Sequence, residues 1–212
     1  MIRTRVLAVA AIATALTVSA ALSQQQQPPG TQRVSGTIER VDGNIIYGKG
    51  SDGSAITLKV ADNVAITAVL KATFADIKPG DYVGTGAVPQ ADGSQKAVEL
   101  RIFPRPQDHG GHFYEGWPGA PNGTMTNGFV QPAGTVSATL VGAGEPSIVV
   151  KYPQGEKRIL ISANAHVVRN VFGSKDDLKT GAVFRAAAAT KQPDGTYTAS
   201  AISVGRDGAR PF

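Results

Sequence analysis

Apolar and polar residues alternate along much of the chain from residue 33 onward. The stretches 56–60 (ITLKV) and 98–102 (VELRI) place an apolar residue at every second position. A period of two is typical of a strand with one buried face. Turn sequences such as Asp42-Gly43-Asn44 separate the alternating stretches. The pattern therefore predicts an all-β protein.

One ten-residue motif occurs twice in the chain. Residues 74–83 (FADIKPGDYV) are echoed by residues 175–184 (KDDLKTGAVF). Each copy of the motif predicts a short helical turn followed by a strand. The turn is expected to end at a glycine with positive φ, Gly80 in the first copy and Gly181 in the second. Self-similarity over most of a chain is typical of repeated structural units. The alignment of the two units places Gly36 on Gly134.

The order of elements predicts the kind of barrel. Five strands with one helical turn between the third and fourth are typical of a small Greek-key barrel of the OB type, although an SH3-like barrel or a sandwich would give similar strings. We therefore predict two tandem small OB-like (five-stranded Greek-key) barrels. The predicted segments are a signal peptide (1–23), a disordered tether (24–32), the first OB-like barrel (33–103), a Gly/Pro-rich linker (104–133), the second OB-like barrel (134–205) and a C-terminal tail (206–212).

The N-terminus has the pattern of an export signal. Arg3 and Arg5 precede an apolar run over residues 6–22, and a Gln-rich stretch follows. This pattern predicts cleavage after Ser23, or alternatively after Ala20, and a periplasmic mature protein. An uncleaved anchor is the alternative, for which an Ala-rich run of this length is marginal. The chain has no cysteine, so no disulfide supports the fold in an oxidising compartment.

Charge and hydropathy exclude two classes of function. The formal charge is +5, and removing Arg3 and Arg5 leaves 19 basic residues against 16 acidic ones. This excess is too small to predict nucleic-acid binding. No second apolar stretch is long enough to span a bilayer, so no stable membrane insertion is expected after cleavage.

Four side chains that can bind metals lie close together in the linker, namely Asp108, His109, His112 and Glu115. Two imidazoles with a carboxylate would suit Zn, Cu or Ni. The alternative is an exposed histidine pair in a Gly-rich linker, since no further ligand is evident. No other cofactor is expected.

Three aromatic residues, Phe113, Tyr114 and Trp117, cluster in the same linker. They could form a recognition surface. Alternatively, they could fold back and plug the groove between the barrels, as buried aromatics fix a loop. We favour the plug.

Candidate catalytic residues are few. No cysteine is present, no serine lies in a nucleophile elbow, and Asp42, Asp52, Asp92 and Asp194 lie at glycine turns where turn chemistry explains them. We therefore expect a protein that is not an enzyme.

Several stretches resemble a family of exported bacterial proteins with tandem OB-like domains of unknown function. They are 36–43 (GTIERVDG), 76–80 (DIKPG), 92–97 (DGSQKA), 124–127 (TMTN) and 204–208 (VGRDG). The resemblance covers nearly the whole mature chain, including Gly111-His112 and Trp117. Similar sequences often carry an automatic label of metal transport permease, which this sequence contradicts because it lacks transmembrane helices. The resemblance implies no established active site.

The sequence as a whole predicts a periplasmic, non-enzymatic binding or interaction module for an envelope protein or a small ligand. The alternative is a metal-binding accessory protein that uses the linker histidines.

Overall fold

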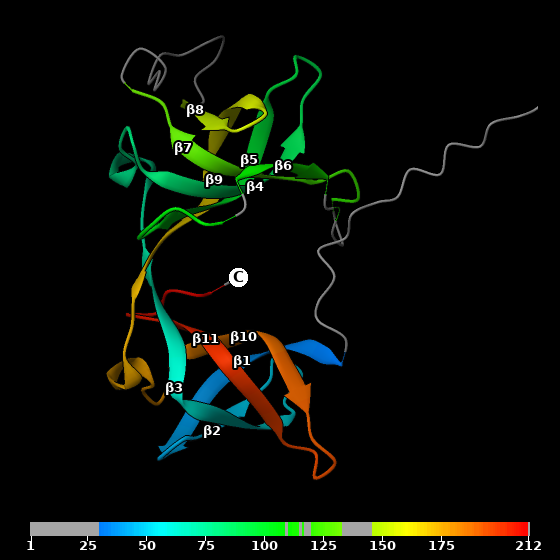
Figure 1. The fold of residues 1–212 in the computed structure, drawn as a ribbon, viewed down its shortest axis with the longest axis vertical. Helices are drawn as coiled ribbons and strands as arrows, with labels where there is room; N and C mark the ends of the chain where they lie inside the picture. The colour runs from blue at the N-terminus through cyan, green and yellow to red at the C-terminus, as the bar shows by residue number, and fades with distance from the viewer. Residues whose placement is uncertain (1–29, 109, 115, 117–119, 133–145, 212) are drawn as a thin grey trace, which may run out of the picture.

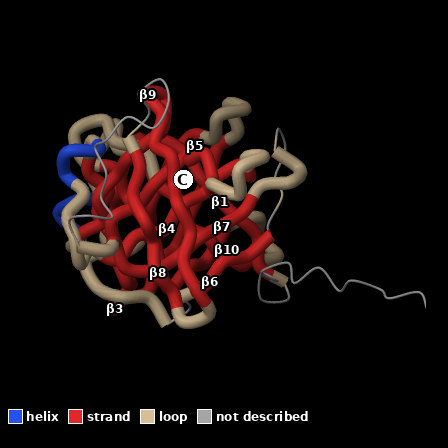
Figure 2. Tube along the Cα trace, turned by 90° about the horizontal axis from the view of Figure 1, so that it is seen from above, coloured by secondary structure: helices blue, strands red, loops and turns tan. Residues whose placement is uncertain are grey.

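The computed structural model describes residues 30–108, 110–114, 116, 120–132 and 146–211. It confirms the all-β prediction, because strands account for most of these residues (Figures 1 and 2). No helix in the described segments is long and apolar enough to cross a membrane. The strands are β1 (Thr31–Asp42), β2 (Ile45–Lys49), β3 (Ala55–Lys71), β4 (Tyr82–Pro89), β5 (Gln95–Phe103), β6 (Gly111–Tyr114), β7 (Thr124–Val130), β8 (Ser147–Tyr152), β9 (Gly155–Phe172), β10 (Val183–Lys191) and β11 (Tyr197–Gly205).

Two short 3-10 helices follow the two longest strands. The first, η1 (Phe74–Asp76), lies between β3 and β4, and the second, η2 (Lys175–Asp177), lies between β9 and β10. Figures 1 and 2 place both on the same side of the molecule. Gly80 and Gly181 follow them with φ of 86° and 85°, as the sequence predicts.

The strands pair into two closed five-stranded rings. Barrel A consists of β1, β2, β3, β11 and β10, paired in that order and back to β1. Barrel B consists of β4, β5, β9, β8 and β7, and closes in the same way. All neighbours are antiparallel except β3 with β11 and β5 with β9. Figure 1 shows barrel A below barrel B.

Each barrel combines strands from both halves of the chain. Strand β3 leaves barrel A and leads through η1 into β4 and β5 of barrel B, while β9 leads through η2 into β10 and β11 of barrel A. Where the two long strands pass each other they pair antiparallel, with Thr67 to Lys71 opposite Phe172 to Val168 (Figure 1). The two halves therefore exchange their last two strands.

This exchange differs from the predicted succession of two barrels. The range 33–103 contains β2 to β5 and all of β1 except Thr31 and Gln32, which lie in the predicted tether. However, β4 and β5 pair with β7 and β9 and do not close a ring with β1 to β3. The predicted linker 104–133 contains β6 and β7, and β7 is a strand of barrel B. The hydrophobic pattern misses β7 because two of its fully buried positions are the polar residues Thr124 and Thr126.

The structural counterpart of Gly36 is Gly128, so the alignment of Gly36 with Gly134 is wrong. Thr37 of β1 pairs with Val183, and Phe129 of β7 pairs with Tyr82, two residues after Gly181 and Gly80 respectively. A Cβ atom at Gly36 would overlap the carbonyl oxygen of Lys49, and one at Gly128 would overlap that of Lys151. Both glycines thus lie where the next strand crosses closely. Gly134 itself lies outside the described residues.

Each barrel has its own hydrophobic core. Burying each large side chain contributes about 1.5 to 3 kcal/mol. The core of barrel A consists of Val34, Ile38, Ile46, Ile56, Leu58, Val60, Leu178, Phe184, Ala186, Ala189, Ala199, Ile202 and Val204. The core of barrel B consists of Ile77, Val83, Ala97, Leu100, Ile102, Val130, Ile148, Val150, Ile159, Ile161 and Val167. A third, small cluster of Val69, Val168 and Ala209 lies where the two long strands meet.

The parallel ladders are interrupted at corresponding places. The ladder of β3 with β11 skips residues 61–64, between Val60 and Ala65. The ladder of β5 with β9 skips residues 162–165, between Ile161 and His166. Such irregular segments open the wall of a barrel, and both line pockets.

Candidate functional site

Arginine side chains from both barrels point out of their cores. Arg101 lies between Leu100 and Ile102, which are both fully buried in barrel B. Arg185 lies between Phe184 and Ala186 of the barrel A core. Because successive side chains of a strand point to opposite faces, both guanidinium groups lie outside the barrels.

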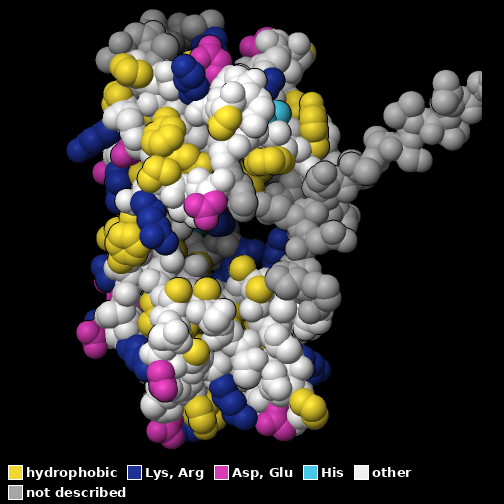
Figure 3. Space-filling view, viewed as in Figure 1, with side chains coloured by type: hydrophobic (Ala, Val, Ile, Leu, Met, Phe, Trp, Pro, Cys, Tyr) yellow, Lys and Arg dark blue, Asp and Glu magenta, His cyan; other side chains and the backbone are white. Residues whose placement is uncertain are grey.

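The two arginines lie near the same place, between the barrels. Arg101 of barrel B lines a small cavity together with Ser203 of barrel A, Asn170 and Pro211. Arg185 is directly opposite Ser203 in the β10–β11 ladder. The C-terminal tail also runs between the barrels (Figure 1). Figure 3 shows Lys and Arg side chains inside the hollow that separates the barrels.

Arg33 and Arg210 add further positive charge to this region. Arg33 precedes the core residue Val34 on β1, and its charge acts on both Arg101 and Arg185. Arg210 lies in the C-terminal tail, and its charge acts on His166. We call Arg33, Arg101, Arg185 and Arg210 the arginine cluster. Glu99 on β5 is the carboxylate that faces it.

Glu99 compensates for only part of this charge. It forms an ion pair with Arg101 at 3.7 Å between Oε1 and Nη2, and the two side chains are 31% and 30% exposed. Among the described residues, no carboxylate lies within ion-pair distance of the other three members of the cluster. Within the described part of the chain, four arginines and one glutamate give this cluster a net charge of +3.

The titration behaviour of the site reflects this imbalance. Burial lowers the pKa of Arg101, Glu99 opposes that shift, and the charge of Arg33 adds to it. Burial likewise lowers the pKa of Arg185, and the charges of Arg33 and Arg101 add to the shift. Arginine stays protonated in proteins, so the two side chains keep their charge. The lowered pKa values mean that water and carboxylates stabilise this charge less than they would in an exposed arginine.

His166 lies beside the cluster in its neutral form. It is opposite Glu99 in the β5–β9 ladder. Burial lowers the pKa of His166 from its ordinary value near 6.5, and the charges of Arg101 and Arg210 lower it further against the effect of Glu99. The imidazole is therefore mostly uncharged at neutral pH.

The four predicted metal ligands are not brought together within the described residues. His109 and Glu115 lie outside them, and Asp108 precedes β6. His112 is on β6, where its Nδ1 lies 2.8 Å from the Thr126 hydroxyl. Burial, and secondly the charge of Lys157, lower the pKa of His112. No group of three His, Cys, Asp or Glu side chains in the described segments could hold a metal ion, and the metal hypothesis stays a prediction.

The predicted aromatic cluster lies on the outside of barrel B. Phe113 and Tyr114 are on β6, which pairs with β7, and they are 38% and 69% exposed. The plug interpretation is therefore wrong for these two residues. Trp117 lies outside the described residues. The recognition surface stays a prediction.

The turn explanation is confirmed for three of the four glycine-linked aspartates, whereas the contact of Asp42 is an ion pair with Arg40. Oδ1 of Asp52, Asp92 and Asp194 each accepts hydrogen bonds from the backbone N–H and the hydroxyl of the residue two positions later. At Asp194 the Thr196 hydroxyl, the Thr196 N–H and Lys59 lower the pKa to about 2. These carboxylates fix turns.

No local pattern in the sequence predicts the arginine cluster. Arg33, Arg101 and Arg185 are far apart in the chain, and each occupies an outward position of an alternating strand. In the sequence, an arginine at such a position cannot be distinguished from one on a solvent-exposed surface. Only the exchange of strands brings β5 of one half next to β10 and β11 of the other.

The described chain is thus an all-β protein with closed five-stranded barrels and a basic cluster between them. Comparison with known proteins returned no matching family model, no matching curated protein and no matching solved structure. The resemblance to exported proteins with OB-like domains stays a prediction.

Proposed function

We propose that this protein is an exported, non-enzymatic binding module of two OB-like units, and that it binds an anionic ligand at the arginine cluster. The observation that carries the proposal is the position of Arg101 and Arg185. They come from different barrels, both lie beside Ser203, and among the described residues Glu99 is the carboxylate whose charge acts on both.

The chemistry of the site suits a small ligand with two acidic oxygens or more. A guanidinium group presents a planar fork of donors that matches carboxylate and phosphate groups. Two such groups on separate barrels would hold a phosphate, a sulfate or a polycarboxylate between them. Relief of the repulsion among the arginines would add to the affinity.

Export and the OB-like assignment rest on the sequence. Arg3, Arg5 and the apolar run predict export, and barrels of this size commonly present binding surfaces. The ligand would then be a soluble anion or an acidic group of an envelope protein. The mass of protein recovered from the periplasm tests export, since an intact Met1 would contradict it.

Calorimetric titration tests the binding proposal. Inorganic phosphate, sulfate and citrate would each be titrated into the mature protein at low ionic strength, where charge interactions are least screened. We expect at least one anion to bind at one site per chain. Arg101→Gln and Arg185→Gln should each lower its affinity about tenfold or more, which corresponds to about 1.4 kcal/mol.

Arg40→Gln is the matched control. It removes the same charge from a side chain that is 61% exposed, pairs with Asp42 and lies over the ring of Tyr47. This variant should bind like the native protein. Absence of binding by all three anions, or equal losses in all three variants, would contradict a site at the arginine cluster.

A further inference from the structure

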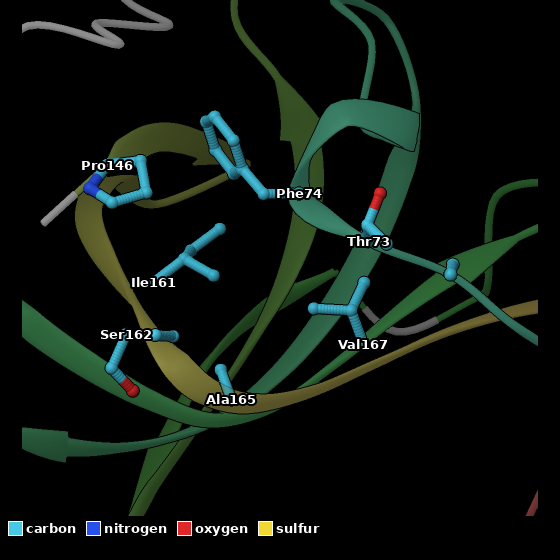
Figure 4. Close-up of a pocket in the computed structure, with 9 residues that line it drawn as sticks. Thr73, Phe74, Pro146, Ile161, Ser162, Ala165 and Val167 are labelled. Carbon is cyan, nitrogen blue, oxygen red and sulfur yellow. The ribbon is translucent and has the colours of Figure 1, made fainter.

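The two barrels differ at one corresponding end, and we infer that this end of barrel B is a binding pocket for an uncharged, apolar ligand. The pocket has a volume of about 410 Å³. Figure 4 shows Phe74 and Pro146 on opposite sides of the pocket, with Ile161 between them. Its lining consists of Ala72, Thr73, Phe74, Pro146, Ile161, Ser162, Ala163, Ala165 and Val167.

Three elements leave this end of the barrel open. The irregular segment 162–165 of β9 departs from the ladder with β5. Phe74 begins η1 above it, and Pro146 precedes β8 on the other side. The floor is formed by Ile161 and Val167, which are core residues of barrel B. A ligand in the pocket would therefore extend the hydrophobic core.

Few polar groups line the pocket. The Thr73 hydroxyl already donates to Oδ2 of Asp76 at 2.8 Å. Ser162 supplies the other hydroxyl, and none of the described lining residues carries a charge. A charged group placed there would lose its hydration without gaining a partner, which is costly.

The corresponding end of barrel A is closed by polar side chains. Lys175 Nζ donates to Oδ1 of Asn44 at 2.7 Å, and Nδ2 of Asn44 donates to Oδ1 of Asp62. This chain of hydrogen bonds joins η2, the start of β2 and the irregular segment of β3 across the opening.

The positions correspond one to one. Lys175 and Phe74 are the first residues of η2 and η1. Asn44 and Pro146 each accept a backbone hydrogen bond from the residue before the irregular segment, Val60 or Ile161. Asp62 lies two residues after Val60, as Ala163 lies two residues after Ile161.

Barrel B thus carries Phe, Pro and Ala where barrel A carries Lys, Asn and Asp. None of the three replacements has a side chain that can form hydrogen bonds. The same opening is therefore closed in one barrel and apolar in the other. This difference between two otherwise similar ends points to a site used in barrel B alone.

The volume sets the size of the ligand. Small-molecule pockets typically measure about 300 to 1,000 Å³. An apolar cavity of about 150 Å³ holds benzene, so the pocket of barrel B would take on the order of ten to fifteen carbon atoms. A hydrocarbon chain or a pair of aromatic rings fits this description, with one polar end near Ser162.

Fluorescence titration with N-phenyl-1-naphthylamine, an uncharged aromatic probe, tests the inference on the full mature chain. We expect saturable binding of one probe per chain, displaced by 1-decanol. Ala165→Leu, which fills the pocket without adding charge, should weaken probe binding about tenfold or more. The triple variant Phe74→Lys, Pro146→Asn, Ala163→Asp carries the polar closure of barrel A and should abolish saturable binding.

Ala61→Leu is the matched control. Ala61 belongs to the irregular segment of β3 and lines a separate, hydroxyl-rich pocket of barrel A, so this variant should bind the probe like the native protein. Circular dichroism of each variant shows whether it is folded, and Ala165→Leu decides the question if the triple variant is not. Lack of saturable binding by the native protein, or equal binding by native and Ala165→Leu, would overturn the inference.

Discussion

At the scale of single residues, corresponding carboxylates in the two 3-10 turns have different partners. Asp76 and Asp177 each close a capping box, with Thr73 and Ser174 respectively. Asp177 also accepts two hydrogen bonds from Arg206, at 2.5 Å from Nε and 3.0 Å from Nη2, and its side chain is 9% exposed. Asp177 therefore ties η2 to the chain that follows β11.

The first residue-scale prediction concerns the pH dependence of this pair. The hydrogen bonds from Arg206 lower the pKa of Asp177 below its ordinary value near 3.9. A lowered pKa means that the ionised form stabilises the fold, so this contribution is present above about pH 4 and is lost as the pH falls through the lowered pKa. Asp177→Asn should reduce the free energy of unfolding by about 1 to 2 kcal/mol at neutral pH.

Urea denaturation at about pH 7 and about pH 3 measures this effect. The difference between native and Asp177→Asn should shrink at the lower pH, because the Asp177 carboxyl of the unfolded chain, with its ordinary pKa, is then mostly protonated and proton uptake favours unfolding. Asp76→Asn is the reference for the capping box, because hydrogen bonds from Thr73 are the main cause of the lowered pKa of Asp76 and Arg169 donates to the Asp76 backbone carbonyl. The pH dependence of Asp177→Asn beyond that of Asp76→Asn is the part due to Arg206. An equal cost of Asp177→Asn at both pH values would show that the ion pair does not stabilise the fold.

At the scale of elements, the sequence predicts most strands. It does not predict a strand whose buried positions are polar, and it does not predict which strands pair with each other. The alternating stretches 56–60 and 98–102 lie in β3 and β5 as expected. The hydrophobic pattern does not predict β7, because threonine occupies two of its buried positions. Threonine can be buried there when its hydroxyl finds a partner inside the sheet, as Thr124 donates to Oε1 of Gln95 at 2.7 Å. The exchange of β4 and β5 was missed because alternation shows that a strand has a buried face without naming its neighbour.

The glycines after the 3-10 turns give a prediction at this scale. Gly80 and Gly181 have positive φ, and a Cβ atom at either would meet no atom within 4 Å. Substitution by alanine therefore costs backbone strain alone, about 1 to 2 kcal/mol, and should cost the same at both sites. Thermal or urea unfolding of Gly80→Ala and Gly181→Ala measures it.

Asparagine is the control at both positions. It tolerates the left-handed region better than alanine, so Gly80→Asn and Gly181→Asn should be less destabilising than the alanine variants. Unchanged stability of both alanine variants would mean that these turns relax to a negative φ without loss.

At the scale of the whole molecule, the crossing of β3 and β9 relates the two halves by an approximate two-fold arrangement. Val69 lies opposite Asn170, 101 positions later. Gly80 and Gly181 differ by the same number. Val69 and its counterpart Asn170 thus face each other at the centre of the crossing, and Thr67 faces Phe172 while its counterpart Val168 faces Lys71. Antiparallel strands about the two-fold axis of two identical subunits pair in this way.

The two proposed ligand sites depart from this symmetry. Across the two halves, Arg185 corresponds to Gly84, 101 positions earlier, and Phe74 of the apolar pocket corresponds to Lys175. The cores and turns keep the two-fold pattern because they determine folding. The proposed sites lie where the halves have diverged, and this is what we expect when two similar barrels acquire different roles.

Cutting the chain between the two halves tests the exchange directly. Residues 104–108 are exposed and join β5 to β6, so a protease site inserted between Pro106 and Gln107 should be tolerated and cleaved. Each barrel would then contain strands of both fragments, held by the β1–β10, β3–β11, β4–β7 and β5–β9 pairings. The fragments should co-elute in size-exclusion chromatography and separate only in denaturant.

Refolding of the cut protein should depend on concentration, whereas refolding of the intact chain should not. If each fragment instead closed its own barrel, dilution would separate two folded pieces, each with the circular dichroism of an intact barrel, and the exchanged topology would be wrong.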